Sequence, residues 1–125
     1  MGIIAKKFNE TYQEYRDRVV NPISKAFCGA KWYNATIWLG NGTTASCHHP
    51  PAHKIPLEEV AMNHKAIHNT SYKKLIRKQM LEGERPRECE YCWKIEDLGE
   101  DKVSDRVHKS VIYTDEELAQ CKSLY

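Results

Sequence analysis

The five cysteines constrain what this chain of 125 residues can become more than any other feature does. Five is an odd number, and the first residues lack the basic-then-apolar order of a secretory signal, so a disulfide framework is not favoured. We therefore expect a reducing, cytoplasmic environment, in which clustered cysteines more often bind metal or perform redox chemistry. A chain of this length buries only about two-thirds of the surface that it exposes when unfolded, so a metal centre would add stability.

Composition and charge narrow the class of protein. Apolar residues make up 41% and charged residues 29% of the chain, as in a single globular domain or a piece of one. Nineteen Lys and Arg against 17 Asp and Glu give a net charge of +2, which is too close to neutral for nucleic-acid binding by bulk charge. Nucleic acid is therefore not an expected partner. A membrane is not expected either, because no apolar run in the sequence is long enough to span one.

Sequence periodicity and caps predict helices at both ends of the chain. Residues 3–20 form one amphipathic stripe, which Asn21-Pro22 ends because proline cannot continue the hydrogen-bond ladder. The stripe consists of Ile4, Phe8, Tyr12, Tyr15 and Val19. Thr114 and Glu117 have the spacing of a capping box, so a last helix is expected to start there.

Two further helices are expected in the middle of the chain. The first is short and covers residues 55–60, with a proline near its first turn. The second covers residues 71–82, capped by one of residues 69–71 and followed by Gly83 in the position that favours glycine. Its expected apolar face consists of Tyr72, Leu75, Ile76 and Met80, and its expected solvated basic face of Lys73, Lys74, Arg77 and Lys78.

A β-hairpin is expected between residues 31 and 47. Residues 32–39 are mostly β-formers, residues 43–47 return, and Asn41-Gly42 is the preferred pair for a type I′ turn, in which both positions have positive φ. Cys28 precedes the outgoing strand and Cys47 ends the returning one. The hairpin can therefore bring these two thiols together, provided that residues 28–31 fold back as a loop.

A second pair of thiols lies further along the chain. Cys89 and Cys92 have the spacing that places two thiols on one side of a turn or helix start. Together with Cys28 and Cys47 they give four thiolates from three segments, a donor set that selects zinc or an iron–sulfur cluster over hard cations. The spread of the ligands over a whole hairpin favours the larger cluster modestly, and zinc stays open. Cys121 fits no motif and is expected to be a thiol on a helix face.

The histidines offer an alternative. His48 and His49 follow Cys47 directly, but neighbours on an extended chain point in opposite directions, so at most one of them can join Cys47 in a mixed zinc site. Such a site would fit a zinc-stapled nucleic-acid-binding or HNH-like nuclease domain, although no His-Asn-His order follows the second cysteine pair. A purely structural interaction module is a third hypothesis. We expect all six histidines to be ordinary surface or hydrogen-bonded residues, and the three tryptophans to pack around the hairpin and the cysteines.

The order and spacing of these residues resemble the twitch domain, the shortened SPASM domain of radical SAM enzymes. The resemblance covers roughly residues 27–112. This part of the chain is similar to the N-terminal twitch segment of a group of radical SAM proteins that are common in phages. It rests on Cys28-x13-Gly42-x4-Cys47, the helix over residues 72–81, Gly83, Arg85-Pro86, Cys89-x2-Cys92, Glu96 and Ser104-x-Arg106. The resemblance implies an auxiliary [4Fe-4S] cluster bound by Cys28, Cys47, Cys89 and Cys92, and the host cytoplasm as the compartment of a phage-encoded member.

One departure from the family concerns catalysis. Radical SAM chemistry needs a Cys-x3-Cys-x2-Cys motif to bind S-adenosylmethionine, and these 125 residues contain none. In the family that motif lies downstream, so we expect the front portion of a longer enzyme, or a stand-alone module, that does not cleave S-adenosylmethionine by itself. The expected role is electron transfer or domain organisation, with Lys31, Arg87 and Lys94 offsetting the charge of the cluster. Expected partners are a radical SAM core domain, in cis or in trans, and an electron donor such as a ferredoxin or flavodoxin.

The sequence thus predicts an α+β fold: a small metal-bound domain with one β-hairpin and several short helices around a four-cysteine site. Residues 1–22 are expected to form the N-terminal helix and residues 23–112 the twitch-like domain. Residues 113–125 are expected to begin a further helix that leads to a downstream domain.

Overall fold

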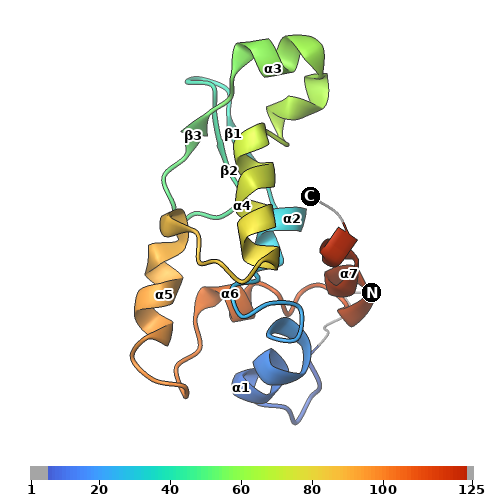
Figure 1. The fold of residues 1–125 in the computed structure, drawn as a ribbon, viewed down its shortest axis with the longest axis vertical. Coiled ribbons are helices and arrows are strands. Elements are labelled where there is room, and N and C mark those ends of the chain that lie inside the picture. Colours follow the sequence, from blue (N-terminus) through green and yellow to red (C-terminus); the bar gives the residue numbers. More distant parts are fainter. Residues whose placement is uncertain (1–5, 124–125) are drawn as a thin grey trace.

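The computed structural model describes residues 6–123, which form a small α+β fold of short helices and a three-stranded antiparallel sheet. The longest helix, α4, runs lengthwise through the centre, with the sheet beside one half of it and α1 and α3 at opposite ends of the molecule (Figure 1). The elements are α1 (Tyr12–Tyr15), the π-helical turn η1 (Arg16–Val20), α2 (Ala30–Tyr33), β1 (Thr36–Trp38), β2 (Thr43–Ala45), β3 (His53–Lys54), α3 (Leu57–Met62), η2 (His64–Ile67), α4 (Ser71–Leu81), η3 (Arg87–Cys89), α5 (Glu90–Glu96), α6 (Asp105–His108), α7 (Asp115–Gln120) and η4 (Cys121–Ser123).

The N-terminal helix is shorter than predicted. It begins at Tyr12 because Thr11 is its N-cap, in a capping box with Glu14. Tyr15 and Val19 of the predicted stripe are buried, whereas Phe8 lies before the helix and is fully exposed. The stripe's first position, Ile4, lies outside the described residues. The predicted end of the helix at residue 21 is confirmed, since η1 ends at residue 20.

The hairpin is confirmed, with corrections at its turn and its start. β1 and β2 pair antiparallel, with Trp38 opposite Thr43. The turn is a four-residue loop in which Gly42 has a φ of +66°. Within residues 6–123 only glycines have positive φ, so Asn41 does not have the positive φ that a type I′ turn requires. The predicted type I′ turn at Asn41-Gly42 is therefore wrong. Residues 30–33 form the helix α2 instead of a loop and the beginning of a strand. A third strand, β3, which the sequence did not predict, pairs with β2.

The faces of α4 also differ from the prediction. The helix has the expected extent and begins at its N-cap Thr70, and Gly83 follows it with a φ of +80°. Its buried side chains are Lys73, Ile76, Arg77 and Met80, whereas the expected apolar positions Tyr72 and Leu75 are exposed. Two of the four basic residues that were expected to be solvated therefore lie inside the fold.

Two apolar clusters form the core. The first joins the N-terminal segment to the last helices and contains Tyr15, Val19, Val20, Phe27, Val107, Leu118 and Cys121. The second contains Ala26, Cys28, Ala30, Met80, Cys89, Cys92 and Trp93. Trp32 packs against both clusters. The predicted helices near residues 55–60 and after the Thr114–Glu117 capping box are confirmed as α3 and α7.

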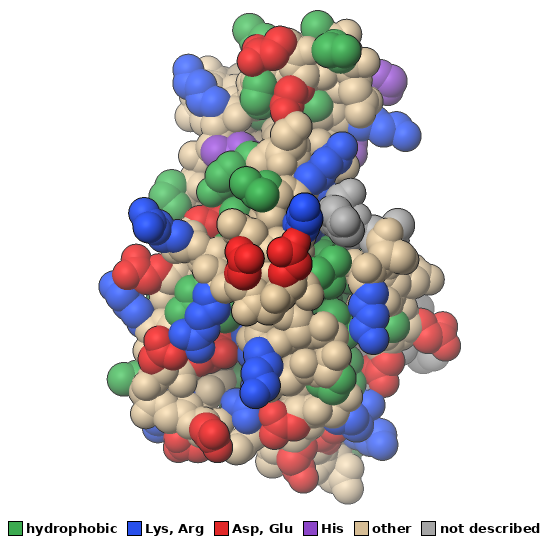
Figure 2. Space-filling model, viewed as in Figure 1, with side chains coloured by type: hydrophobic (Ala, Val, Ile, Leu, Met, Phe, Trp, Pro, Cys, Tyr) green, Lys and Arg blue, Asp and Glu red, His purple; other side chains and the backbone are tan. Residues whose placement is uncertain are grey.

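The surface carries both signs of charge. Figure 2 shows acidic and basic side chains interspersed over the visible face, with apolar side chains gathered at the end where α3 lies. Leu57 and Met62 of α3 are almost fully exposed there. None of the helices in the described part of the chain has the length and apolar character needed to cross a membrane.

Candidate metal centre

All four predicted cysteine ligands line one small cavity of about 20 Å³. Cys28 directly precedes α2, Cys47 follows β2, and Cys89 and Cys92 lie at the junction of η3 with α5. Cys28, Cys89 and Cys92 are buried, and Cys47 is partly exposed. The fold therefore brings cysteines from three distant segments to the lining of the same cavity.

The segment that carries Cys28 is held from both sides. The buried Arg106 donates from Nη1 to the carbonyl of Phe27 at 3.0 Å, and the amide of Gly29 donates to Ser110 Oγ at 3.1 Å. A side chain at Gly29 would meet Leu118 Cδ2 of α7 at 2.7 Å, so any larger residue here would require the Leu118 side chain to move. These contacts fix the position of the thiol beside the cavity.

The second thiol pair is fixed by the start of α5. Cys89 is the N-cap residue of this helix, and Cys92 lies within its first turn, which places both thiols toward the same cluster. Trp93 lines the cavity, and its indole Nε1 donates to the carbonyl of Pro86 at 2.8 Å. Met80 of α4 also lines the cavity. Sulfur atoms and apolar side chains thus form a large part of the cavity wall.

Burial favours the protonated form of Cys28, Cys89 and Cys92 by raising the pKa of each thiol. It raises the pKa of Cys28 to about 11 and that of Cys89 to about 12, and the neighbouring cysteines add to both shifts. The pKa of Cys92 is also raised by burial, although a hydrogen bond with Ser104 acts in the opposite direction. A thiol that binds a metal must lose its proton, so metal binding here would release protons.

Basic side chains surround the cavity, but not all of those that were predicted. Lys31 lines it as expected, whereas Arg87 and Lys94 are exposed elsewhere, and the remaining positive charges come from Arg106 and Lys109. Burial lowers the pKa of Lys31, whereas the neighbouring Cys89 and Glu88 raise it. The net effect is a raised pKa. Ser104 and Arg106 are part of the resemblance to the twitch domain, but no role was predicted for either residue.

Cys47, His48 and His49 form a second candidate group. The chain bends over residues 46–50, so the ligand atoms of all three lie within 4.8 Å of one another. The prediction that only one histidine could join Cys47 is therefore wrong, because the segment is not extended. His49 Nε2 also lies 2.6 Å from Asp105 Oδ2, an interaction that lowers the pKa of Asp105.

The remaining candidates lie apart from the cavity. Cys121 is buried in the first core cluster, where it packs against the N-terminal segment. His53 Nε2 lies 2.8 Å from Thr70 Oγ1, and His108 Nδ1 lies 3.3 Å from Asp105 Oδ1, in line with the expected hydrogen-bonded roles. Trp38 is exposed on the hairpin. Of the three tryptophans, only Trp93 lines this cavity.

The donor set fits a soft metal centre. Four thiols suit zinc or an iron–sulfur cluster, and zinc–sulfur bonds of about 2.3 Å in a tetrahedron place the sulfurs about 3.8 Å apart. Among the described residues the four cysteines do not form a group whose sulfurs all lie within 4.8 Å of one another. In a cubane each thiolate binds a different iron, which suits the wider spacing. The cavity has room for about one water molecule, so binding a cluster requires the lining side chains to move outward.

The comparisons with known proteins give no relative. No family model matches the chain, and no curated protein or solved structure matches it either.

Proposed function

We propose that residues 23–112 form an auxiliary [4Fe-4S]-binding module, the N-terminal part of a radical SAM enzyme of the phage type. The proposed ligands are Cys28, Cys47, Cys89 and Cys92. The observation that carries this proposal is that these four thiols, from three segments, line one cavity with apolar walls. The resemblance of their order and spacing to the twitch domain supports the same assignment.

The proposed role is electron transfer or the organisation of a neighbouring catalytic domain. A bound cluster would supply a one-electron carrier, and four cysteine ligands would leave no iron open to substrate. Lys109 would place positive charge beside the thiolates, because Lys31 and Arg106 are already paired with Glu88 and Glu96. Met80 and Trp93 would shield the cluster from water. Any S-adenosylmethionine would bind through a downstream radical SAM domain, in cis or in trans, and a ferredoxin or flavodoxin is the proposed electron donor.

The direct test is the metal content of the chain purified without oxygen, followed by reconstitution with iron and sulfide. We expect about four irons and four acid-labile sulfides per polypeptide, as four-thiolate ligation of a cubane requires. Single alanine variants of the four proposed ligands should lower the iron content and the cluster absorbance. Cys121→Ala is the matched control, because Cys121 is also buried but lies in the other core cluster.

Two results would overturn the proposal. One is a reconstituted chain that binds no iron and sulfide, and the other is an equal loss of iron in the Cys121 variant and the ligand variants. One zinc per chain without sulfide would point to the alternative function, a zinc-stapled nucleic-acid-binding or nuclease-like domain.

The group formed by Cys47, His48 and His49 favours that alternative, since three soft or borderline ligands already lie close together. If zinc binds there, His48→Gln and His49→Gln should each release it, while Cys28→Ala should retain it. The cluster proposal gives the reverse pattern for iron. Divalent-metal-dependent cleavage of DNA would then single out a nuclease.

A further inference from the structure

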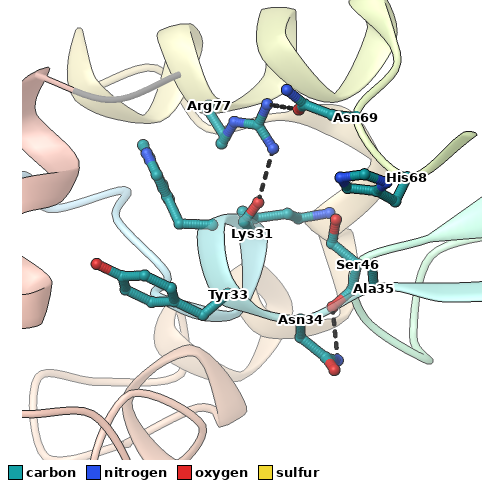
Figure 3. A pocket seen from close by; sticks show the side chains of 9 residues that line it. Lys31, Tyr33, Asn34, Ala35, Ser46, His68, Asn69 and Arg77 are labelled. Atoms are coloured by element: carbon teal, nitrogen blue, oxygen red, sulfur yellow. Dashed lines mark hydrogen bonds between the residues drawn. The ribbon is translucent and has the colours of Figure 1, made fainter. Parts of the chain in front are cut away.

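A second cavity lies beside α2, and Lys31 of this helix lines both it and the cysteine cavity. It is an open cleft of about 410 Å³ between α2, the segment after it, the residues that lead into α4, and α4 itself. Figure 3 shows side chains from these segments around it, including Tyr33, Asn34, His68, Asn69 and Arg77. Its volume lies within the range of small-molecule sites, about 300–1,000 Å³.

Arg77 is the only arginine that lines this cleft, and its side chain is almost entirely buried. The residue is 6% exposed, and its guanidinium reaches from α4 toward α2 (Figure 3). It donates from Nη1 to the carbonyl of Lys31 at 3.1 Å and from Nη2 to Asn69 Oδ1. Its Nε is buried and has no hydrogen-bond partner. Two of its five N–H groups are thus used, and both partners are neutral.

The charge of Arg77 has no counterion on the described part of the chain. Every ion pair of the described residues involves other side chains, so no carboxylate lies within 4.0 Å of this guanidinium. Buried charges in proteins are normally paired, because removing an ion from water is costly. Burial accordingly lowers the pKa of Arg77. A buried, unpaired guanidinium beside an open cleft is what an anion-binding site requires.

The charge and shape of the cleft favour a carboxylate over a phosphate. The ammonium of Lys31, the other cation of the lining, is already paired with Glu88, so one positive charge is left for a ligand, and a carboxylate carries one negative charge. A planar carboxylate also matches the fork of a guanidinium. The aromatic rings of Trp32 and Tyr33 belong to the same lining and suit a flat apolar body. We propose that this cleft binds an organic carboxylate, with its carboxylate on Arg77 and its apolar part against these rings.

Benzoate is the probe for this site, and benzamide is its uncharged counterpart. In titrations of the full chain, followed by calorimetry and ¹H–¹⁵N spectra, benzoate should give saturable shifts at the Arg77 Nε–H and the Trp32 indole N–H. Benzamide and inorganic phosphate should bind at least tenfold more weakly. Arg77→Gln and Arg77→Lys should each raise the dissociation constant of benzoate at least tenfold, because neither side chain can form the paired hydrogen bonds of a guanidinium with a carboxylate. Lys74→Gln is the matched control, because this lysine is exposed on the same helix.

Several outcomes would overturn the proposal. These are shifts that do not saturate or lie away from the cleft, equal binding of benzamide, tighter binding of phosphate, or unchanged affinity in both Arg77 variants. If the Arg77 variants do not fold, the location of the shifts in the unaltered chain still decides. The inference is independent of the metal, since none of the four proposed cysteine ligands lines this cleft.

Discussion

Lys31 of α2 and Glu88 of η3 form an ion pair between the cysteine cavity and the sheet, with side chains only 4% and 12% exposed. The carbonyl of Lys31 accepts from Arg77, so one residue of α2 contributes to the walls of both candidate sites. Tyr72 also donates to Glu88 Oε1 at 2.7 Å, which leaves both carboxylate oxygens hydrogen-bonded. The pair, together with Tyr72, therefore joins α2, α4 and η3 beside the cavity that the cysteines line.

Removing one member of this pair should destabilise the fold strongly. Glu88→Gln leaves the Lys31 ammonium buried without a counterion, and breaking a buried pair in this way costs about 3–5 kcal/mol. Glu90→Gln is the control, because Glu90 pairs with Lys94 where both side chains are well exposed, and such pairs contribute about 0–1 kcal/mol. Urea unfolding of the two variants measures the difference. Equal free energies of unfolding would contradict the structural role given to Glu88.

Lys109 offers a test of the proposed cluster that does not disturb a buried ion pair. It lines the cysteine cavity, is partly exposed, and forms no salt bridge with a described carboxylate. A positive charge nearby favours the more negative, reduced form of a cluster, so Lys109→Gln should lower the reduction potential. A Coulomb interaction over about 10 Å at an effective dielectric constant of about 20 gives a shift of about 70 mV.

The control for Lys109 is Lys94→Gln, which removes the same charge from an exposed site outside the cavity lining. Its potential should change by only a few millivolts. Protein-film voltammetry of the reconstituted chains measures both values. A shift of equal size in the two variants would show that the potential responds to net charge alone.

Local signals explain why parts of the fold could be predicted from the sequence. The capping box of Thr114 with Glu117 and the position of Gly83 each depend on residues within one turn, and the structure has them as expected. The hairpin likewise follows from the pairing of two neighbouring strands.

Other features depend on contacts between distant segments, which periodicity does not contain. Lys73 and Arg77 were expected on a solvated face of the helix, but the structure buries both. Their burial is possible because Thr44, His68 and Lys31 accept their hydrogen bonds. The proximity of His48 and His49 likewise depends on a bend of the chain that the sequence pattern does not signal. Both candidate sites therefore contain residues that reasoning from the sequence missed.

At the N-terminus, Glu10 should give an acid-dependent stability. Arg18 donates to both of its carboxylate oxygens, at 2.7 and 3.0 Å, and lowers the pKa of Glu10 from 4.5 to about 2. A lowered carboxyl pKa adds stability above the unfolded value and loses it as the pH falls toward 2. Glu10→Gln should therefore cost up to about 1 kcal/mol at pH 6, as a surface pair does, and almost nothing at pH 2.

Chemical unfolding of the Glu10 variant across this pH range measures the effect. Glu84→Gln serves as the comparison, because Glu84 is exposed and forms no ion pair with a described residue. A stability difference for Glu10→Gln that stays constant from pH 6 to pH 2 would show that the carboxylate charge is not what Arg18 recognises.

Lys73 should produce the opposite kind of pH dependence, at alkaline pH. Its ammonium is buried and donates to Thr44 Oγ1 at 2.8 Å and to the carbonyl of His68 at 3.2 Å, and burial lowers its pKa to about 8. Between pH 8 and 10.5 the unfolded chain binds more protons at this site than the folded chain does, so its contribution to stability rises with pH. Lys73→Met removes the titration. The free energy of unfolding of the unaltered chain, minus that of the variant, should therefore increase by about 2 kcal/mol from pH 7 to pH 10. The buried thiols titrate in both proteins, so the difference between the two proteins isolates Lys73. A difference independent of pH would mean that Lys73 keeps its ordinary pKa in the folded chain and that burial does not shift it.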